Sequence, residues 1–542
     1  MEQDAAPPVV AAFKIEFDQK VGYTLAWQRA LPDVNLDGVE FKSLPSGLHG
    51  VKDDLVYFLH GHYAGISAFV QEEADEQQRN ASFVAVGALV GLAHGKLGRS
   101  WLHAAELRRL AKDLVGRSSD ARTLQLFWDR HRQSERSSGG GSKPTSPVSA
   151  KRNSIPITPS KRHSDSSHGF KLDAGGVADH PALYMPGLLD SFGPLIFPLY
   201  RAALLRKRIL FLTTPPVQRS CCVVYILSVL ASITQPMAES LQPDVEPLHR
   251  AHPLFSVGIS DIPLLSQHSR TGWIATTTDD ILGEKSKLWD MIVDVGPGEP
   301  GSKRRWPKMR TSDGKPVKAT QRDLRRYRLL RGELRRMRLA RKRYRDSLDS
   351  HSESLDDDRE PLVRSATVLK EPAGPEEMHS SETEVVEPVS WIGMAYDSLM
   401  WWASAGDEEA WAKEEIAADQ KLLDDLPDIH QALPQPTSRD DAVQEGLYEA
   451  QETATVMTAY FHRLTSVFIQ GLASLVEEAD DETEEGIEED AIAITNDDIR
   501  AMGLDTWSEN DKGFIKGMMK LYFGREAVVA DGGIRLCGVR VC

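Results

Sequence analysis

A change of composition between Ser134 and Val177 divides this chain and limits what can fold on either side of it. The stretch is rich in Ser, Gly, Lys and Pro and holds a single aromatic residue, Phe170. It therefore lacks the apolar side chains that a core needs, and we expect a disordered linker over 133–179. With 542 residues, the chain is long enough for two or three domains that each bury a core of their own.

Before this linker, the apolar residues alternate with a period of two. Phe13, Ile15 and Phe17 begin a hairpin that returns through Trp27. A second hairpin is expected over 55–70, then a strand over 83–88 and helices over 101–115 and 124–131. These elements predict an α+β module over 10–132, preceded by an N-terminal tail over 1–9.

After the linker, the pattern changes to strand, loop and helix. Arg208–Thr213 is predicted to be a buried strand, and two prolines follow it. The apolar segment Cys221–Ile233, of 13 residues, is predicted to be a buried helix too short to span a bilayer. This order is typical of a mostly parallel sheet with helices on both faces. We therefore expect an α/β module over 180–295.

The remainder of the chain is expected to be mainly helical. Residues 296–389 form a basic and then acidic insertion that should interrupt the core rather than complete it. Residues 390–525 contain a long amphipathic helix from Val443 to Leu475, and Thr495 and Ser508 are placed to cap two shorter helices. Residues 526–542 read as a C-terminal hairpin or tail.

The insertion holds an unusual concentration of positive charge. Gln321–Arg345 carries eleven arginines and one lysine against two acids, in a chain whose formal charge is −16. Its apolar stripe would let it lie on an anionic membrane surface, and the candidate contact residues are Arg335, Arg336, Arg338 and Arg341. The alternatives are an exposed helix neutralised by the acidic run at 346–360, or an RNA contact. The net negative charge argues against DNA binding.

Motifs for covalent catalysis or metal binding are absent from the sequence. Gly91–Leu97, GLAHGKL, is one residue too short for a phosphate-binding loop and lacks the Ser or Thr that holds magnesium. His49, His60 and His62 are close in sequence but favour ordinary surface or core roles. Four cysteines without a paired spacing indicate neither disulfides nor zinc. We therefore assign no catalytic, cofactor or metal residue and expect a cytoplasmic protein, peripheral on intracellular membranes.

The linker contains candidate modification sites. Ser146 and Thr158 each precede proline, and Ser154 and Ser164 follow basic pairs. Phosphate groups there would pair with the local Lys and Arg and alter how the flanking modules dock.

Two stretches resemble a known family. LDGVEFKSLPSGLHGVKDDLVYF over Leu36–Phe58 and GWIATTTDDIL over Gly272–Leu282 are similar to segments of the DENN domain, and the first resembles the LCHN branch, here in a fungal form with long insertions. The resemblance covers about two thirds of the chain. It implies that 10–132 is a longin-like upstream module, 180–295 the central DENN module and 390–525 the downstream helices.

The resemblance also implies a function. DENN proteins generally regulate small GTPases of the Rab class, usually by guanine nucleotide exchange across both modules. A non-catalytic trafficking adaptor that binds a GTPase is the main alternative. A GTPase-activating protein is a third possibility. It would need an exposed catalytic arginine, for which the candidates are Arg99, Arg108 and Arg109.

Overall fold

The computed structural model describes most of the chain, in separate stretches. These are residues 6–18, 22–72, 82–115, 121–132, 179–267, 270–296, 306–352, 383–388, 408–424, 442–484, 491–529, 535–536 and 539–540. Residues 133–178 of the predicted linker, with the phosphorylation candidates Ser146, Ser154, Thr158 and Ser164, lie outside the described residues.

One ten-stranded sheet runs through both predicted modules. Its strand order is β10-β9-β6-β8-β7-β3-β4-β5-β1-β2. The strands are β1 (Val9–Asp18), β2 (Gly22–Ala30), β3 (Asp53–His60), β4 (Tyr63–Glu72), β5 (Ser82–Gly91), β6 (Arg208–Leu212), β7 (Pro253–Ser256), β8 (Trp273–Thr277), β9 (Met291–Asp294) and β10 (Lys308–Thr311). The residues on the two sides of the linker therefore build one continuous sheet.

The two halves of this sheet have different topology. Strands β1 to β5 pair antiparallel, which agrees with their period-two pattern. The pairs β1–β2, β3–β4 and β4–β5 are consecutive in the chain, and β1 also pairs with β5. Strands β7, β8, β6 and β9 pair parallel, because a helix or a loop crosses over between them. Strand β10 is antiparallel to β9 and forms an edge.

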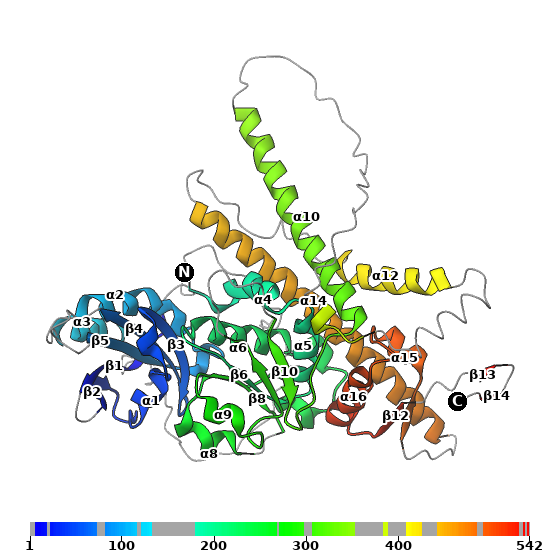
Figure 1. Cartoon of the computed structure of the whole chain (residues 1–542), viewed down its shortest axis with the longest axis horizontal. Coiled ribbons are helices and arrows are strands. Elements are labelled where there is room, and N and C mark those ends of the chain that lie inside the picture. The colour runs from blue at the N-terminus through cyan, green and yellow to red at the C-terminus, as the bar shows by residue number, and fades with distance from the viewer. Residues whose placement is uncertain are drawn as a thin grey trace, which may run out of the picture.

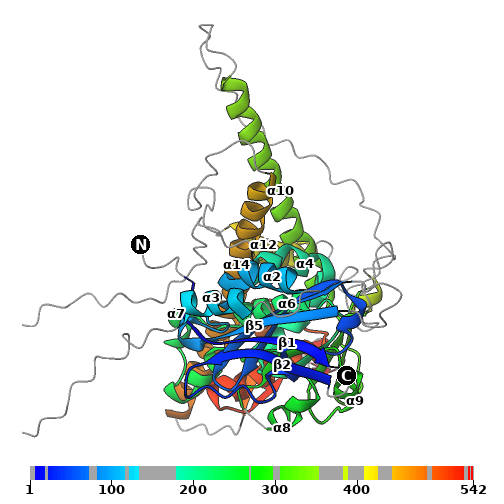
Figure 2. The same cartoon turned by 90° about the vertical axis from the view of Figure 1, so that its left-hand side faces the viewer.

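Helices cover both faces of the sheet (Figures 1 and 2). One face carries α2 (Ala104–Leu114), α3 (Ala121–His131), α4 (Met185–Phe192), α5 (Ile196–Leu204) and α6 (Gln218–Leu230), and α7 (Gln235–Ala238) follows α6 in the chain. The other face carries α1 (Val39–Ser43), α8 (Ile262–Leu265) and α9 (Asp280–Glu284). Single 3₁₀ turns occupy Leu48–Gly50, Leu92–His94, Ser100–His103, Pro181–Tyr184, Gly193–Leu195, Pro243–His249, Ile259–Asp261 and Thr383–Val385.

Two apolar cores follow from these layers. The larger core spans the sheet, the first set of helices and the helical third of the chain. A smaller one lies under the parallel half and includes Trp273, Leu282 and the fully buried Trp289, whose indole N–H donates to the Leu282 carbonyl at 3.1 Å. The continuous helical stretch Pro181–Leu204 is long and apolar enough to cross a membrane, but 67% of its most apolar window is buried against the rest of the protein.

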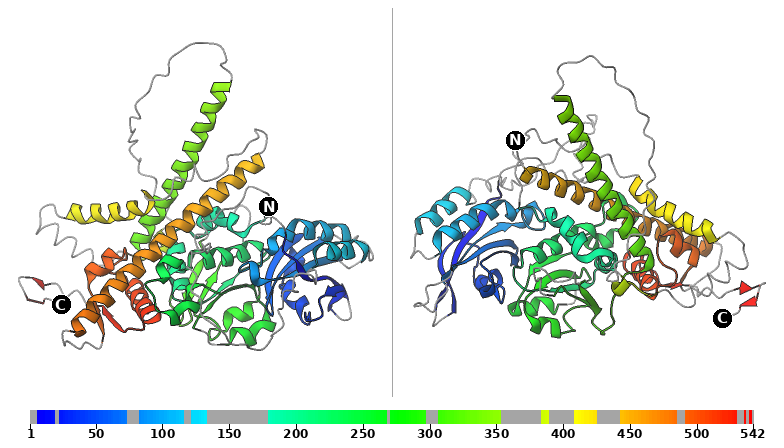
Figure 3. Two further views of the ribbon diagram at one scale, coloured as in Figure 1. Left: turned by 180° about the vertical axis from the view of Figure 1, so that it is seen from behind. Right: turned by 45° about the horizontal axis from the view of Figure 1, so that its top comes forward.

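The C-terminal third is helical, as its pattern predicts (Figure 3). Its helices are α10 (Gln321–Ser352), α12 (Glu408–Asp424), α14 (Ala442–Glu484), α15 (Asn496–Ala501) and α16 (Glu509–Met518), followed by a π-helical turn over Met519–Phe523. Thr495 and Ser508 cap α15 and α16 as predicted, each accepting a hydrogen bond from the amide three residues on. Four short strands complete it among the described residues: β11 (Ile492–Ile494) pairs parallel with β12 (Ala527–Val529), and β13 (Arg535–Leu536) pairs antiparallel with β14 (Val539–Arg540).

The prediction that 296–389 interrupts the core is wrong. Strand β10 extends the main sheet, and Trp306 and Met309 are buried. The first turns of α10 are also buried, where Tyr327 and Leu330 are fully covered. Beyond these turns, α10 projects away from the body (Figure 1).

A buried ion pair fixes α10 to the central module. The Arg201 guanidinium of α5 donates to both carboxylate oxygens of Asp323, at 2.8 and 2.6 Å, and it lies 3.2 Å from Asp511 of α16. Tyr200, the preceding residue, donates its hydroxyl to the Phe461 carbonyl of α14 at 3.0 Å. Helix α5 therefore joins three elements of the C-terminal third to the sheet. The fold class predicted from the sequence, α+β and α/β parts with a helical final third, is confirmed.

Candidate protein-binding interface

The two halves of the sheet meet along a short seam between β3 and β7. One residue pair, Phe58 with Phe255, forms the register there. Phe255 has φ of 60°, a left-handed conformation that is unfavourable for a bulky side chain. Both rings are fully buried. The seam is thus held by side-chain packing and by contacts beyond the sheet rather than by a long hydrogen-bond ladder.

Asp54 of β3 supplies one such contact by capping α6 across the seam. Its carboxylate accepts from the amides of Val217 and Gln218, at 2.6 and 3.1 Å, and from the Leu55 amide at 2.8 Å. An acceptor at this position satisfies amides that have no partner within the helix. Burial raises the pKa of Asp54, although these hydrogen bonds oppose the change.

Lys42 of α1 provides a second contact across the seam. Its ammonium lies 2.7 Å from the buried carboxylate of Asp261, beyond β7, and donates to the Leu59 carbonyl at 3.1 Å. Asp261 also accepts from the Gly258 amide at 3.0 Å. The ion pair therefore holds α1 against the loop that follows β7.

A third contact links the segment after α1 with the segment after β8. The Ser46 hydroxyl donates to Asp279 at 2.5 Å, and the Asp279 amide in turn bonds to the Thr277 hydroxyl at 3.1 Å. A Cβ at Gly258 would lie 3.4 Å from the Asp279 carboxylate and 3.9 Å from the Phe41 carbonyl. The three segments therefore meet at one place.

Around these contacts, three large apolar side chains face solvent. Phe41, Ile259 and Ile281 are 57%, 51% and 51% exposed and come from α1, from the 3₁₀ turn after β7 and from α9. We call these three residues the junction patch. Their elements lie on the same face of the sheet (Figure 1), opposite α2 and α6. Apolar side chains gathered on a surface, with polar groups beside them, are typical of protein-binding sites.

The junction patch brings together the two segments that resemble the DENN domain. Leu36–Phe58 contributes Phe41, Lys42 and Ser46, while Gly272–Leu282 contributes Asp279 and Ile281. Sequence reasoning identified both segments but not their contact, because no local pattern reports that residues so far apart lie together. The sequence likewise does not show which apolar side chains of a mostly buried segment are exposed.

No covalent chemistry is evident in the described part of the chain. It contains no group of three or more His, Cys, Asp or Glu side chains placed to hold a metal ion. Cys221 and Cys222 are buried in α6, and burial raises the pKa of both thiols. They therefore stay protonated and unreactive at neutral pH. Residues 91–97 form the end of β5, a 3₁₀ turn and a following turn.

The four candidate membrane-contact residues lie on α10. Arg335, Arg336 and Arg338 are exposed, and Arg341 is half-buried. Arg336 pairs with Glu333 on the same helix at 2.8 Å. Within the described residues, Arg338 and Arg341 pair with acids of α14, as the ion pairs Arg338–Glu449 and Arg341–Glu452 show. Part of the positive charge of α10 is thus neutralised within the protein, and membrane contact stays a prediction.

The arginines considered for an activating role are not grouped as one donor site. Arg108 donates to Asp179 at 2.5 Å and to Gln218 at 3.2 Å, so its guanidinium is held by its neighbours. Arg99 takes a left-handed backbone conformation ahead of the Ser100–His103 turn, and Arg109 is exposed on α2. All three lie on the α2 side of the sheet rather than at the junction patch.

Comparison with known proteins gives matches both to the sheet-forming part of the chain and to its helical third. A family profile, "DENN domain-containing protein 11", matches residues 12–304, and one for a domain of unknown function matches 386–491 and 482–542. "DENN domain-containing protein 11" of Danio rerio is 33% identical over 289 residues, and that of Xenopus laevis is 31% identical over 288 residues. Each match covers 53% of this chain, and 53% and 59% of the relative, so the chain spans little more than half the length of these relatives.

A fungal relative matches over almost its full length. "Uncharacterized protein ANR2" of Saccharomyces cerevisiae is 23% identical over 572 residues, covering 97% of this chain and 93% of that protein. The match therefore includes the helical third as well as the sheet. Since the DENN profile covers more than half of the chain, from within β1 to beyond β9, this protein belongs to the DENN domain-containing protein 11 family.

Proposed function

We propose that this protein binds a small GTPase of the Rab class at the junction patch and accelerates the release of its guanine nucleotide. The observation that carries the proposal is the meeting of the two DENN-like segments at one exposed apolar surface across the seam. DENN domains generally act on Rab GTPases as exchange factors, and family membership gives this chain the same candidate partner. We also propose that the protein belongs to the LCHN branch of DENN proteins, which its segment Leu36–Phe58 resembles.

Exchange needs no nucleophile, base or metal from the protein, so the structure and the proposed activity are compatible. An exchange factor acts by binding the nucleotide-free GTPase more tightly than the loaded one. An acceleration of 10⁴-fold requires a preference of about 5–6 kcal/mol. An interface that buries about 800 Å² on each partner can supply this difference.

The junction patch is suited to such differential binding because it draws on both halves of the sheet. Phe41 belongs to the antiparallel half, whereas Ile259 and Ile281 belong to the parallel half. A GTPase seated there would contact both halves at once. Asp54 and Lys42 hold these halves in register, so they would position the patch without touching the partner.

The test is fluorescence-monitored release of labelled GDP from a panel of Rab proteins, with the full chain as catalyst. Faster release from at least one Rab supports exchange. Binding that is independent of nucleotide and leaves the release rate unchanged would instead identify an adaptor. Faster GTP hydrolysis would identify an activating protein.

We also propose that the exposed part of α10 contacts an anionic membrane surface, through Arg335 and Arg336 in particular. These two side chains are exposed, and Arg336 pairs with Glu333 on the same helix, whereas Arg338 and Arg341 pair with acids of α14. Flotation with phosphatidylserine liposomes tests this. Replacing Arg335 and Arg336 by Glu should reduce flotation, and unchanged flotation would rule the contact out.

A further inference from the structure

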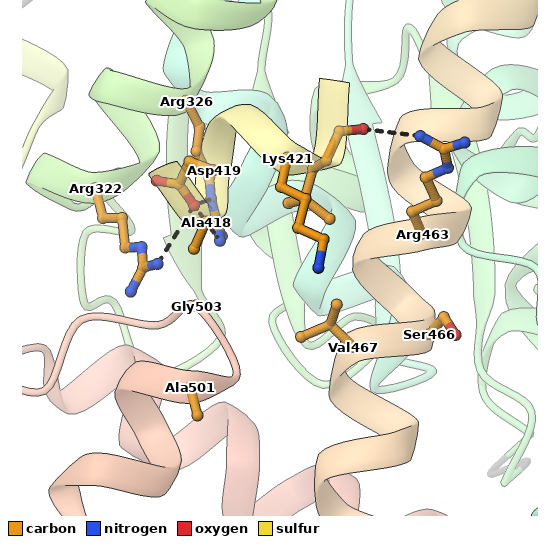
Figure 4. A pocket seen from close by; sticks show the side chains of 11 residues that line it. Arg322, Arg326, Ala418, Asp419, Lys421, Arg463, Ser466, Val467, Ala501 and Gly503 are labelled. Atoms are coloured by element: carbon orange, nitrogen blue, oxygen red, sulfur yellow. Dashed lines mark hydrogen bonds and ion pairs between the residues drawn. The ribbon is translucent and has the colours of Figure 1, made fainter. Parts of the chain in front are cut away.

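A pocket of about 420 Å³ lies between α10, α12, α14 and the turn after α15, on the helical third and away from the junction patch. Four cationic side chains line it, Arg322, Arg326, Lys421 and Arg463, together with a single carboxylate, Asp419. Figure 4 shows that they come from three helices and that the Arg463 guanidinium is turned toward a carbonyl oxygen of α12. The remaining lining side chains are small or apolar, apart from Ser466.

Asp419 pairs with two of these cations through one of its carboxylate oxygens. Its Oδ1 accepts from Arg326 Nε at 2.8 Å and from Arg322 at 3.3 Å. All three residues are nearly buried, with 2–3% exposure. Glu415, which does not line the pocket, pairs with Arg325 at 2.5 Å and lies 3.8 Å from Arg322. Two buried guanidinium groups at the wall of the pocket therefore share Asp419, and Glu415 is a second, more distant carboxylate near Arg322.

The charge on this wall is incompletely compensated. Burial, followed by the neighbouring Arg326, lowers the pKa of Arg322, so the two like charges oppose each other. Arg322 donates from Nη1 to the Arg500 carbonyl at 3.2 Å, while its buried Nε has no partner among the described residues. A buried donor without an acceptor is unfavourable and points to an acceptor that binds there.

Lys421 and Arg463 add two further positive charges. Within the described part of the chain, Lys421 makes no hydrogen bond or ion pair, and Figure 4 shows its ammonium directed into the space between α12 and α14. Arg463, on α14, donates to the Leu422 carbonyl of α12 at 3.1 Å. The lining therefore carries four positive charges and one negative charge around a space large enough for a small molecule.

We propose that this pocket binds a multiply phosphorylated small-molecule group, either free in solution or as the headgroup of a lipid. Phosphate oxygens accept charge-assisted hydrogen bonds from Arg and Lys and would compensate the excess charge. Several phosphates on one compact scaffold fit cations that approach from three sides better than a single phosphate does. Binding would join α10, α12 and α14 at the base of the projecting α10.

Titration calorimetry of the full chain tests this, with inositol hexakisphosphate, inorganic phosphate and vesicles containing phosphatidylinositol 4,5-bisphosphate as probes. We expect saturable binding of inositol hexakisphosphate that is much tighter than binding of inorganic phosphate. Additional binding to the phosphoinositide vesicles, but not to phosphatidylserine vesicles, would identify the lipid headgroup as a source. Saturable binding of the soluble probe alone would identify a free ligand.

Variants connect the binding to the pocket. Lys421→Gln should weaken binding about tenfold, because it removes a charge-assisted contact without disturbing a buried group. Arg463→Gln should weaken it similarly, and Lys421→Arg should retain it. Lys516→Gln, which changes the same charge at an exposed position on α16, is the matched control. Absence of saturable binding, or equal affinity in Lys421→Gln and Lys516→Gln, would overturn the proposal.

Discussion

Replacing Asp54 by Ala tests whether the two halves of the sheet behave as one unit. The substitution removes the acceptor of the Val217 and Gln218 amides at the start of α6. Loss of a carboxylate cap destabilises a helix by about 1–2 kcal/mol, and the buried Val217 amide left without a partner adds about 1–3 kcal/mol. We expect a combined loss of about 2–5 kcal/mol, which is roughly 30- to 5000-fold in the local opening equilibrium.

Hydrogen–deuterium exchange measured by mass spectrometry is the suitable assay, because it reports local opening in a protein of this size. Peptides from β3 and α6 should exchange faster in the Asp54→Ala variant, while peptides from α14 should not change. Asp54→Asn keeps one acceptor oxygen and should show a smaller effect. Asp53→Ala removes the neighbouring exposed carboxylate and is the control for charge. Equal protection of α6 in Asp54→Ala and Asp53→Ala would refute the reasoning.

Three further predictions concern contacts between the central module and the later part of the chain. Arg201→Met leaves Asp323 and Asp511 buried without their cation. It should therefore destabilise the protein by about 3–5 kcal/mol, measured as a lower urea midpoint. A loss of stability under about 1 kcal/mol would contradict this. Burial raises the pKa of Asp511 to about 7, so its contribution to stability is present below about pH 4 and is lost as pH rises through 7. Asp511→Asn should therefore flatten the pH dependence of the melting temperature between pH 5 and 8, whereas an unchanged profile would exclude this titration. Trp306→Ala should destabilise the protein by about 3–5 kcal/mol, whereas Leu339→Ala, at an exposed position, should cost less than about 0.5 kcal/mol. Similar urea midpoints for the two variants would show that β10 does not belong to the core.

The parts of the fold that local pattern determines were predictable from the sequence. Alternation with a period of two identified the hairpins, and the apolar periodicity of 443–475 identified α14. The caps at Thr495 and Ser508 were predictable as well, since the capping residue and its amide partner lie three positions apart. Each of these signals is contained within a few turns or strands.

The role of α10 was not predictable in the same way. Eleven arginines made the segment look like a solvated insertion, yet its first turns are buried. The buried arginines pair with acids from distant elements, as Arg322 and Arg326 do with Asp419 of α12. The apolar stripe at Leu324, Tyr327 and Leu330 was the one local sign of burial. Long-range ion pairing of this kind has no signature in sequence spacing.

The candidate interface was predictable only in part. The segments that form it could be identified by resemblance, but their contact could not. The contacts Ser46–Asp279 and Lys42–Asp261 join residues that are far apart in the chain. The exposure of Phe41 and Ile259 also depends on how the loops are folded. The surface therefore required the structure.

The most direct test of the proposed function is GDP release from a Rab panel with three forms of the protein. The wild type should accelerate release from at least one Rab. Phe41→Asp combined with Ile259→Asp should slow this release about tenfold or more, at an unchanged melting temperature, because two exposed apolar contacts are replaced by charge. Leu126→Asp, at an equally exposed apolar position on α3, should keep wild-type activity. Exchange that is equal in the wild type and the double variant, or no acceleration of any Rab by the wild type, would contradict the proposal.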